Sequence, residues 1–283
     1  MLKVTQFIII SLLFLASQAQ SAELKVSVQL WSLKQALKTD FKGTIQALAE
    51  MGFQGVELAN EFGEFADNPT GLVEFIRRQG MEISGAHTVF PWLAPDKIDA
   101  TLKFYGAAEV PMLVIAWDDR AFAPETVWQT IADLNRLHKP VTEAGFRFGY
   151  HNHAEEFAPY RGTTTLWDHI AYSTPESLVM QLDAGWAKTA GIEPETIVQQ
   201  HPGRTFSIHY KASSPESASN ARPIIGEDTI NWPALIAANK QVGGTQWVVL
   251  EQEVYPDGLK PLEAIKLSKQ ALDRFLNASA TQN

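Results

Sequence analysis

Eight short runs of β-branched and apolar residues recur along the chain, and their regular spacing is the feature that most constrains the fold. Successive runs begin 30, 27, 30, 35, 31, 28 and 41 residues apart. The runs are Lys25–Leu30, Gly55–Leu58, Glu82–Ala86, Met112–Ala116, Arg147–Tyr150, Leu178–Leu182, Phe206–His209 and Trp247–Leu250. Helix-like stretches with apolar residues three and four positions apart lie between them, at 41–51, 72–80, 126–144 and 262–277. The pattern predicts a strand followed by a helix, repeated eight times.

Eight strand–helix units in residues 23–283 match the count and size of a single (β/α)₈ TIM barrel, an α/β fold. A doubly wound open sheet is the alternative. Such sheets usually carry a glycine-rich phosphate loop after the first strand, whereas Leu30-Trp31-Ser32-Leu33 follows the first strand here. No low-complexity linker divides the chain, so we predict one barrel domain spanning 23–283.

The first 22 residues have the layout of a secretory signal peptide. Lys3 supplies a positive charge, the apolar run Phe7–Ala16 follows, and small and polar residues come after it. The run is too short to cross a bilayer, which takes about 20 apolar residues. We therefore predict a signal peptide at 1–22 and a periplasmic or secreted protein with no membrane attachment after cleavage. An uncleaved N-terminal membrane anchor is the alternative.

Composition excludes several classes of site. The chain has no cysteine, so disulfides, thiolate metal sites and a cysteine nucleophile are excluded. With 23 Lys and Arg against 32 Asp and Glu, the formal net charge is −9 at pH 7. Binding to nucleic acid depends largely on positive charge, and no Lys/Arg cluster offsets this balance. We therefore expect no nucleic-acid partner.

Polar and aromatic residues collect where each predicted strand stops, and in a TIM barrel the chemistry lies at those carboxyl ends. The residues there are Gln29, Glu57, His87, Trp117 with Asp118, His151 to His153, Asp183, His209 with Lys211, and Glu251 with Glu253. Histidine and carboxylate ligands without cysteine suit a divalent ion such as Mn²⁺, Mg²⁺, Zn²⁺ or Co²⁺. We expect one such ion at the mouth of the barrel.

Four of these segments resemble the xylose isomerase-like TIM-barrel superfamily, which includes sugar isomerases and epimerases, inosose dehydratases and AP endonucleases. They are Gly149–His153 followed by Glu156-Phe157, Gln181–Asp183, Ile208–Lys211 and Leu250–Glu253. The resemblance implies one divalent metal held at the ends of strands five to eight, with ligands at His151, Asp183, His209 and Glu251. The strand-five ligand is usually a Glu that also moves a proton in the epimerases, and His151 replaces it here.

The remaining candidates fall into two groups, each with a structural alternative. Proton transfer is assigned to His153, Glu251 and Glu253, and substrate contact to Glu57, His87, Trp117, Trp186 and Lys211. A buried core histidine is the alternative for His151, a salt-bridge partner for Glu57, and a carboxylate supporting Glu251 for Glu253. Core packing is the commoner use of tryptophan.

Such a site would support proton transfer next to a carbonyl. A divalent ion on adjacent carbonyl and hydroxyl oxygens acidifies the neighbouring C–H, and an imidazole or carboxylate can move that proton. We therefore expect a metal-dependent isomerase or epimerase whose partner is a small-molecule carbohydrate. An exported protein without a basic cluster for phosphate points to unphosphorylated sugars or keto-sugars. The alternatives are a lyase or dehydratase acting on 3-keto-glycosides or cyclitols by β-elimination, and a non-catalytic sugar-binding barrel.

Overall fold

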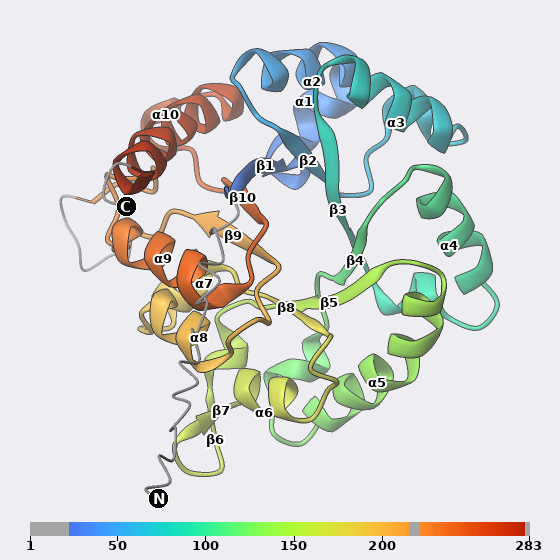
Figure 1. Ribbon diagram of the computed structural model, residues 1–283, viewed down its shortest axis with the longest axis vertical. Helices are drawn as coiled ribbons and strands as arrows, with labels where there is room; N and C mark the ends of the chain where they lie inside the picture. The colour runs from blue at the N-terminus through green and yellow to red at the C-terminus, as the bar shows by residue number, and fades with distance from the viewer. Residues whose placement is uncertain (1–22, 215–220, 281–283) are drawn as a thin grey trace, which may run out of the picture.

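The computed structural model describes residues 23–214 and 221–280, which form a closed ring of eight parallel strands surrounded by helices (Figure 1). The neighbouring strands follow the order β8-β5-β4-β3-β2-β1-β10-β9. Their bounds are β1 Lys25–Gln29, β2 Gly55–Leu58, β3 Glu82–Thr88, β4 Met112–Ile115, β5 Arg147–His151, β8 Val179–Gln181, β9 Ser207–Lys211 and β10 Trp247–Glu251. All eight predicted strands are confirmed.

The barrel closes between β8 and β9, the two ends of that order. The His209 backbone N–H donates to the Leu182 carbonyl at 2.8 Å, and Asp183 pairs with His209 in parallel register. The Met180 N–H also donates to the Arg204 carbonyl at 2.8 Å. These contacts leave no open edge for a doubly wound sheet, so the predicted TIM barrel is confirmed.

Ten α-helices of the described residues lie outside the strands (Figure 1). Their bounds are α1 Lys34–Thr39, α2 Phe41–Glu50, α3 Pro69–Arg78, α4 Ile98–Ala107, α5 Val127–Glu143, α6 Leu166–Tyr172, α7 Ala184–Thr189, α8 Pro194–Gln200, α9 Trp232–Ala238 and α10 Pro261–Ala280. The four helical stretches named from the sequence coincide with α2, α3, α5 and α10. A short hairpin of β6 (Pro159–Tyr160) and β7 (Thr164–Thr165), which the sequence pattern did not predict, lies between β5 and α6.

Capping residues and glycines set several of the strand–helix boundaries. Asp40 starts α2 by accepting the Gly43 N–H at 2.9 Å, and Asn68 starts α3 by accepting the Gly71 N–H at 2.9 Å. Gly52 follows α2 with φ of 82°, a left-handed conformation that glycine adopts without strain. The chain can therefore turn sharply from the helix into β2.

The inside of the barrel changes character along its axis. A buried apolar cluster, separate from the core between strands and helices, consists of Met112, Val114, Val179, Phe206, Trp247 and Val249. Alternate residues of a strand share one side of the sheet, so β10 presents Trp247 and Val249 to this cluster and Glu251 to the mouth. A Cβ at Gly55 would lie 2.9 Å from the Trp247 ring, so glycine makes room for that side chain.

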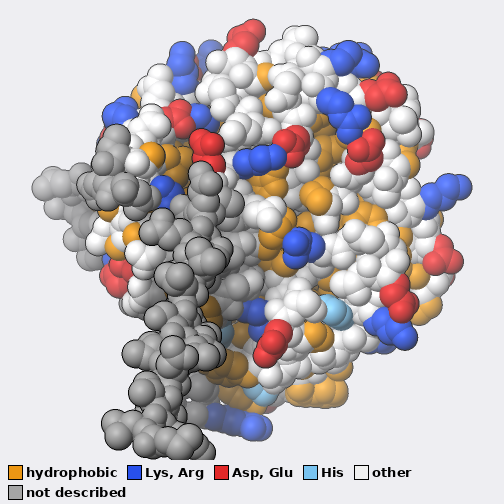
Figure 2. All heavy atoms as spheres, viewed as in Figure 1, with side chains coloured by type: hydrophobic (Ala, Val, Ile, Leu, Met, Phe, Trp, Pro, Cys, Tyr) orange, Lys and Arg blue, Asp and Glu red, His pale blue; other side chains and the backbone are white. Residues whose placement is uncertain are grey.

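The described residues include no helix long and apolar enough to cross a membrane. The predicted signal peptide at 1–22 lies outside the described residues. On the face drawn in Figure 2, acidic and basic side chains are interspersed and form no extended patch of one sign.

Candidate metal centre

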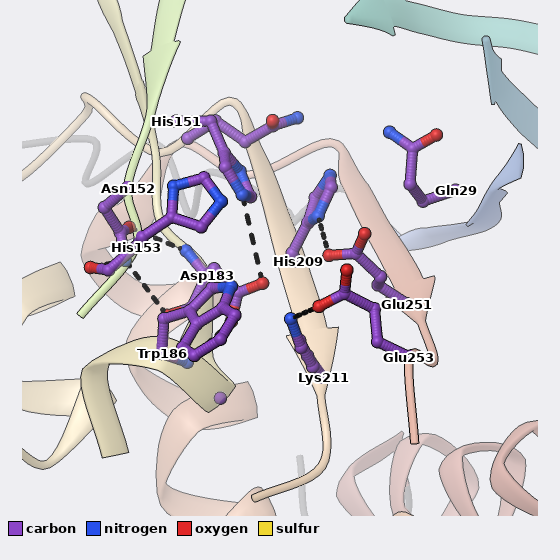
Figure 3. Close-up of polar contacts among 12 residues, drawn as sticks. Gln29, His151, Asn152, His153, Asp183, Trp186, His209, Lys211, Glu251 and Glu253 are labelled. Carbon is purple, nitrogen blue, oxygen red and sulfur yellow. Dashed lines mark hydrogen bonds and ion pairs between the residues drawn. The ribbon is translucent and has the colours of Figure 1, made fainter. Parts of the chain in front are cut away.

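The four residues expected to bind a metal ion converge at the carboxyl ends of the strands (Figure 3). His151 ends β5, Asp183 follows β8, His209 lies on β9 and Glu251 ends β10. One donor atom from each can be chosen so that all four lie within 4.8 Å of one another. All four side chains are buried. Residues at the ends of four neighbouring strands of the barrel therefore face a single point.

Two atoms of this cluster show that it suits an ion. His151 Nδ1 and Asp183 Oδ2 are buried and have no hydrogen-bond partner among the described residues. His151 Nε2 lies 4.0 Å from the same Asp183 oxygen. A buried polar atom left unpaired costs about 1–3 kcal/mol, and most such atoms in proteins find a partner. Two imidazoles and two carboxylates fit the ligand preference of Zn²⁺ and similar ions, which would satisfy these atoms.

Asp183 is fixed by the backbone around it. Its Oδ1 accepts the Trp186 N–H at 2.8 Å and caps α7, while its own N–H donates to Asn152 Oδ1 at 2.8 Å. The first bond orients the carboxylate, and the second ties it to the segment after β5. Burial raises the pKa of Asp183 to about 7, against the opposing charge of Lys211.

His209 lies between two carboxylates. Its Nε2 is 2.6 Å from Glu57 Oε2, and its Nδ1 is 3.0 Å from Glu251 Oε2. Burial alone lowers the pKa of His209, but Glu57 and Glu251 outweigh it and raise the pKa to about 10. Burial raises the pKa of Glu251, yet Lys211 and His209 hold it well below its usual range. Without an ion, His209 is therefore a cation at neutral pH.

Glu57 was expected to contact the substrate, and the structure places it behind His209 instead. It is fully buried and accepts hydrogen bonds from Gln29 Nε2 and Gln181 Nε2, each at 2.7 Å. Although burial raises its pKa, His209 and His87 hold the pKa of Glu57 below its usual value. A carboxylate that accepts the outer N–H of a ligating imidazole orients that ring, and this position of Glu57 suits that task.

A cavity of about 440 Å³ opens above the cluster. It is lined by Trp31, Ala59, Asn60, His87, Val89, Ala116, Trp117, His151, His153, Trp186, Glu251 and Glu253. The lining holds all three residues expected to transfer protons and three of the five expected to contact substrate. Glu57 and Lys211 are outside it. The Lys211 ammonium pairs with Glu253 and lies 4.0 Å from the centroid of the Trp186 ring.

His87 was expected to contact the substrate, and its ring lies directly against the four-residue cluster. Its ring stacks on His209 with centroids 5.1 Å apart, and it lies 4.9 Å from the ring of His151. His87, His151 and His209 form a second group of donor atoms within 4.8 Å of one another. Burial lowers the pKa of His87, so its ring is neutral at pH 7. His87 could therefore face either an ion or a substrate oxygen.

His153 is held at the cavity by a residue to which the sequence analysis gave no role. Glu156 is buried, accepts the His153 N–H at 2.9 Å and accepts the Tyr150 hydroxyl at 2.7 Å. Burial, with Lys211 nearby, lowers the pKa of His153 to about 4, so its imidazole is neutral at pH 7 and only weakly basic. Glu156 comes three residues after the Tyr-His-Asn-His segment and was part of the motif on which the family resemblance rests, so that motif was the available clue.

The fold and this cluster together define a TIM-barrel protein with a candidate metal centre at its carboxyl-end mouth. The chain belongs to the xylose isomerase-like TIM-barrel family, whose sequence model matches residues 45–277. The resemblance seen in the sequence is confirmed at the level of the family.

Individual relatives are distant. An inosose dehydratase of Bacillus licheniformis is 21% identical over 268 residues, covering 81% of this chain and 87% of that protein. The structure of a sugar phosphate isomerase/epimerase of Parabacteroides distasonis has a TM-score of 0.75 at 19% identity, covering 89% of this chain and 99% of the other. The IOLI protein, solved with a bound zinc atom, has a TM-score of 0.68 at 12% identity, covering 90% and 99%. At these identities the solved structures establish a shared fold.

Proposed function

We propose that the protein is a metal-dependent isomerase or epimerase of unphosphorylated sugars or keto-sugars. The observation that carries this proposal is the convergence of His151, Asp183, His209 and Glu251, with two of their buried atoms unpaired beneath an open cavity. When bound, a divalent ion would polarise adjacent carbonyl and hydroxyl oxygens of a sugar and acidify the C–H beside them.

We assign the removal of that proton to His153. Its neutral imidazole lines the cavity, and its buried Nδ1 has no partner among the described residues. The hydrogen bond from the His153 backbone N–H to Glu156 fixes the position of the backbone that carries the ring. A positioned general base of this kind contributes about 10²–10⁴-fold to a rate. The same group can return the proton to the neighbouring carbon on the same face, giving isomerisation. Epimerisation needs a second acid on the opposite face, and Glu251 is another candidate for proton transfer that lines the cavity.

Glu253 has a different role in this proposal. It accepts the Trp31 Nε1–H at 3.1 Å and pairs with Lys211, so both of its oxygens are engaged. A carboxylate held by two donors is a poor base but a good fixed acceptor for a sugar hydroxyl. We therefore assign Glu253 to substrate orientation and Lys211 to holding Glu253.

The cavity lining favours an uncharged substrate. Among the described residues that line it, none is Lys or Arg, the residues that usually bind phosphate. Three tryptophans line it, and aromatic faces suit the apolar C–H faces of a sugar ring. Export through the predicted signal peptide at 1–22 is part of this proposal, because phosphorylated sugars are scarce outside the cytoplasm.

A lyase or dehydratase is the second candidate, favoured by His151 in place of the usual family Glu. With a single imidazole rather than a carboxylate at strand five, proton removal could be followed by loss of a leaving oxygen from the next carbon. The inosose dehydratase relative has a name of this class. The substrates would be 3-keto-glycosides or cyclitols.

The test uses the protein loaded with Mn²⁺, Zn²⁺ or Co²⁺ in deuterated water with a panel of aldoses, ketoses and 3-keto-glycosides. The proposal predicts deuterium in recovered sugar that depends on the ion and on His153. An enone product absorbing in the ultraviolet would instead establish the lyase. Carbohydrate binding without exchange or elimination under any of the ions would contradict both and leave a sugar-binding barrel.

A further inference from the structure

Three tryptophans stand around the mouth of the barrel, and we call them the tryptophan collar. Trp31 follows β1, Trp117 follows β4 and Trp186 follows β8, on α7. Going round the sheet, β4 is three strands from β1, β8 is two strands from β4, and β1 is three strands further on. The collar therefore surrounds the cavity rather than forming one wall of it.

The collar stands above the candidate metal centre. Trp31 is 44% exposed and Trp117 is 50% exposed, whereas His151 and Glu251 on the cavity floor are 3% and 5% exposed. All four residues line the same cavity. Both indoles are therefore available at the mouth, although the Lys34 ammonium lies 3.9 Å from the centroid of the Trp31 ring.

The exposed rings are held in place rather than free to turn. Trp31 Nε1 donates to Glu253 Oε1 at 3.1 Å. The Trp117 ring packs edge-on against Phe122 and His153, with centroids 4.9 and 4.5 Å away. Large apolar surfaces at a mouth mark ligand-binding grooves, and fixing them beforehand lowers the entropy cost of binding.

The mouth also has room beyond one ring. A second cavity of about 140 Å³ shares Trp31 and Glu253 with the main cavity. Ser32, Lys34, Gln252 and Tyr255 are among the other residues that line it. Trp31 therefore lies between the larger cavity over the candidate metal centre and a smaller one beside it.

We propose that the substrate is a glycoside: its reacting sugar lies over the metal centre, and a second ring that does not react lies against Trp31 and Trp117. The inference rests on the proposed function for the identity of the reacting sugar. It adds the substrate class, a sugar joined to another ring rather than a free monosaccharide. The reacting unit must keep a carbonyl, so it is either the reducing end of a disaccharide or a glycoside unit that carries a keto group. The second ring can be a sugar or an aromatic aglycone, since both offer a face to an indole.

The experiment measures binding and needs no turnover. Methyl and phenyl glycosides of glucose and galactose, together with the disaccharides cellobiose and lactose, are titrated by calorimetry into the full chain with and without Zn²⁺. For at least one of the sugars we expect the phenyl glycoside or the disaccharide to bind about tenfold tighter than the methyl glycoside. Equal affinity within each series, or no binding at all, would overturn the proposal.

Variants of the collar separate the two compartments. Trp31→Ala and Trp117→Ala should each reduce the preference for the second ring about fivefold, because they weaken phenyl glycoside or disaccharide binding more than methyl glycoside binding. Trp31→Phe, with a smaller face, should keep part of the preference. Trp128 on α5 is 60% exposed and lines neither cavity, so Trp128→Ala is the matched control and should change nothing. Equal loss for methyl and phenyl glycosides would contradict the assignment of these rings to a second unit.

This outcome can be told apart from the proposed reaction. A preserved second-ring preference with no ion-dependent deuterium exchange would contradict the reaction and support the collar. Exchange on free monosaccharides, with no second-ring preference, would support the reaction and overturn the collar.

Discussion

The two halves of the barrel interior use the same strands for different purposes. Toward the amino ends, alternate residues form an apolar cluster that includes Met112, Val249 and Trp247. One step further along β10 the inward position is Glu251, which faces His209 at 3.0 Å. Packing alone satisfies this apolar cluster, which we call the lower cluster. The polar layer at the mouth, formed by Glu57, His151, Asp183, His209 and Glu251 and called the upper layer, needs a specific partner for every group.

This difference separates stability from function along one axis. The packing of the lower cluster depends on volume, and removing atoms there leaves a cavity. The upper layer holds charges that burial disfavours unless they are paired. His151 Nδ1 and Asp183 Oδ2 remain unpaired in that layer, and no atom of the lower cluster's side chains is polar apart from the Trp247 indole nitrogen. A ligand that pairs with these two atoms would therefore stabilise the upper layer, whereas the lower cluster has no such unpaired group.

The largest expected effect is on the reaction of the upper layer. His153→Gln keeps a polar side chain but removes the neutral imidazole, so we expect ion-dependent exchange in deuterated water to slow about 10²–10⁴-fold. Zn²⁺ affinity, measured by calorimetry, should stay within about threefold because His153 is outside the ligand set. Full exchange activity in this variant would contradict the assignment of the base.

A change in the lower cluster should have the opposite profile. Met112 is fully buried, and Met112→Ala should lower the free energy of unfolding by about 2–5 kcal/mol in urea titrations. The folded protein should bind Zn²⁺ with unchanged affinity. A loss of metal affinity as large as that expected for a ligand substitution would show that the two halves are not separable.

Glu57 tests the boundary between the halves. Glu57→Gln keeps the shape but removes the charge next to His209 Nε2, so we expect Zn²⁺ affinity to fall about 10–100-fold. Glu64, an exposed residue paired with Lys42, is the control, and Glu64→Gln should leave affinity unchanged. If both variants bind Zn²⁺ like the unaltered chain, Glu57 does not orient His209.

The smallest expected effect comes from pH. With a pKa of about 10, His209 carries a proton at pH 7, and an ion must displace it. Lowering the pH from 7 to 6 raises the proton concentration tenfold, so Zn²⁺ affinity should fall about tenfold. Asp183, with a pKa of about 7, adds to the fall in the same direction because its protonated form is a poorer ligand. Calorimetry at pH 6, 7 and 8 checks this, and a flat profile would contradict it.

The fold could be predicted from the sequence because each strand–helix repeat is marked by residues close together in the chain. Strand runs such as Trp247–Leu250 and the Gly52 turn can be recognised within a few residues, and their count defines the barrel. The carboxyl-end rule then brought His151, Asp183 and His209 to one place. The strand-end position of each residue was enough to predict that they converge.

Partners that meet across the barrel could not be predicted in this way. Glu57 and His209 are 152 residues apart, and Glu57 looked like other polar strand ends until its neighbours were known. Asn152 binds the Asp183 backbone across 31 residues. Glu156 accepts the His153 N–H from the turn that follows it. A carboxylate three residues away is common on any loop, so this role could not be recognised from the sequence. Such roles depend on side-chain direction and burial, which no local pattern contains.

Metal analysis of the purified protein tests the central claim most directly, comparing the unaltered chain with Asp183→Ala and His209→Ala. The account predicts about one divalent ion per chain in the unaltered protein and at least a tenfold loss of Zn²⁺ or Mn²⁺ affinity in each variant. Equal metal content and affinity in all three proteins would show that the four converging side chains do not form the metal centre.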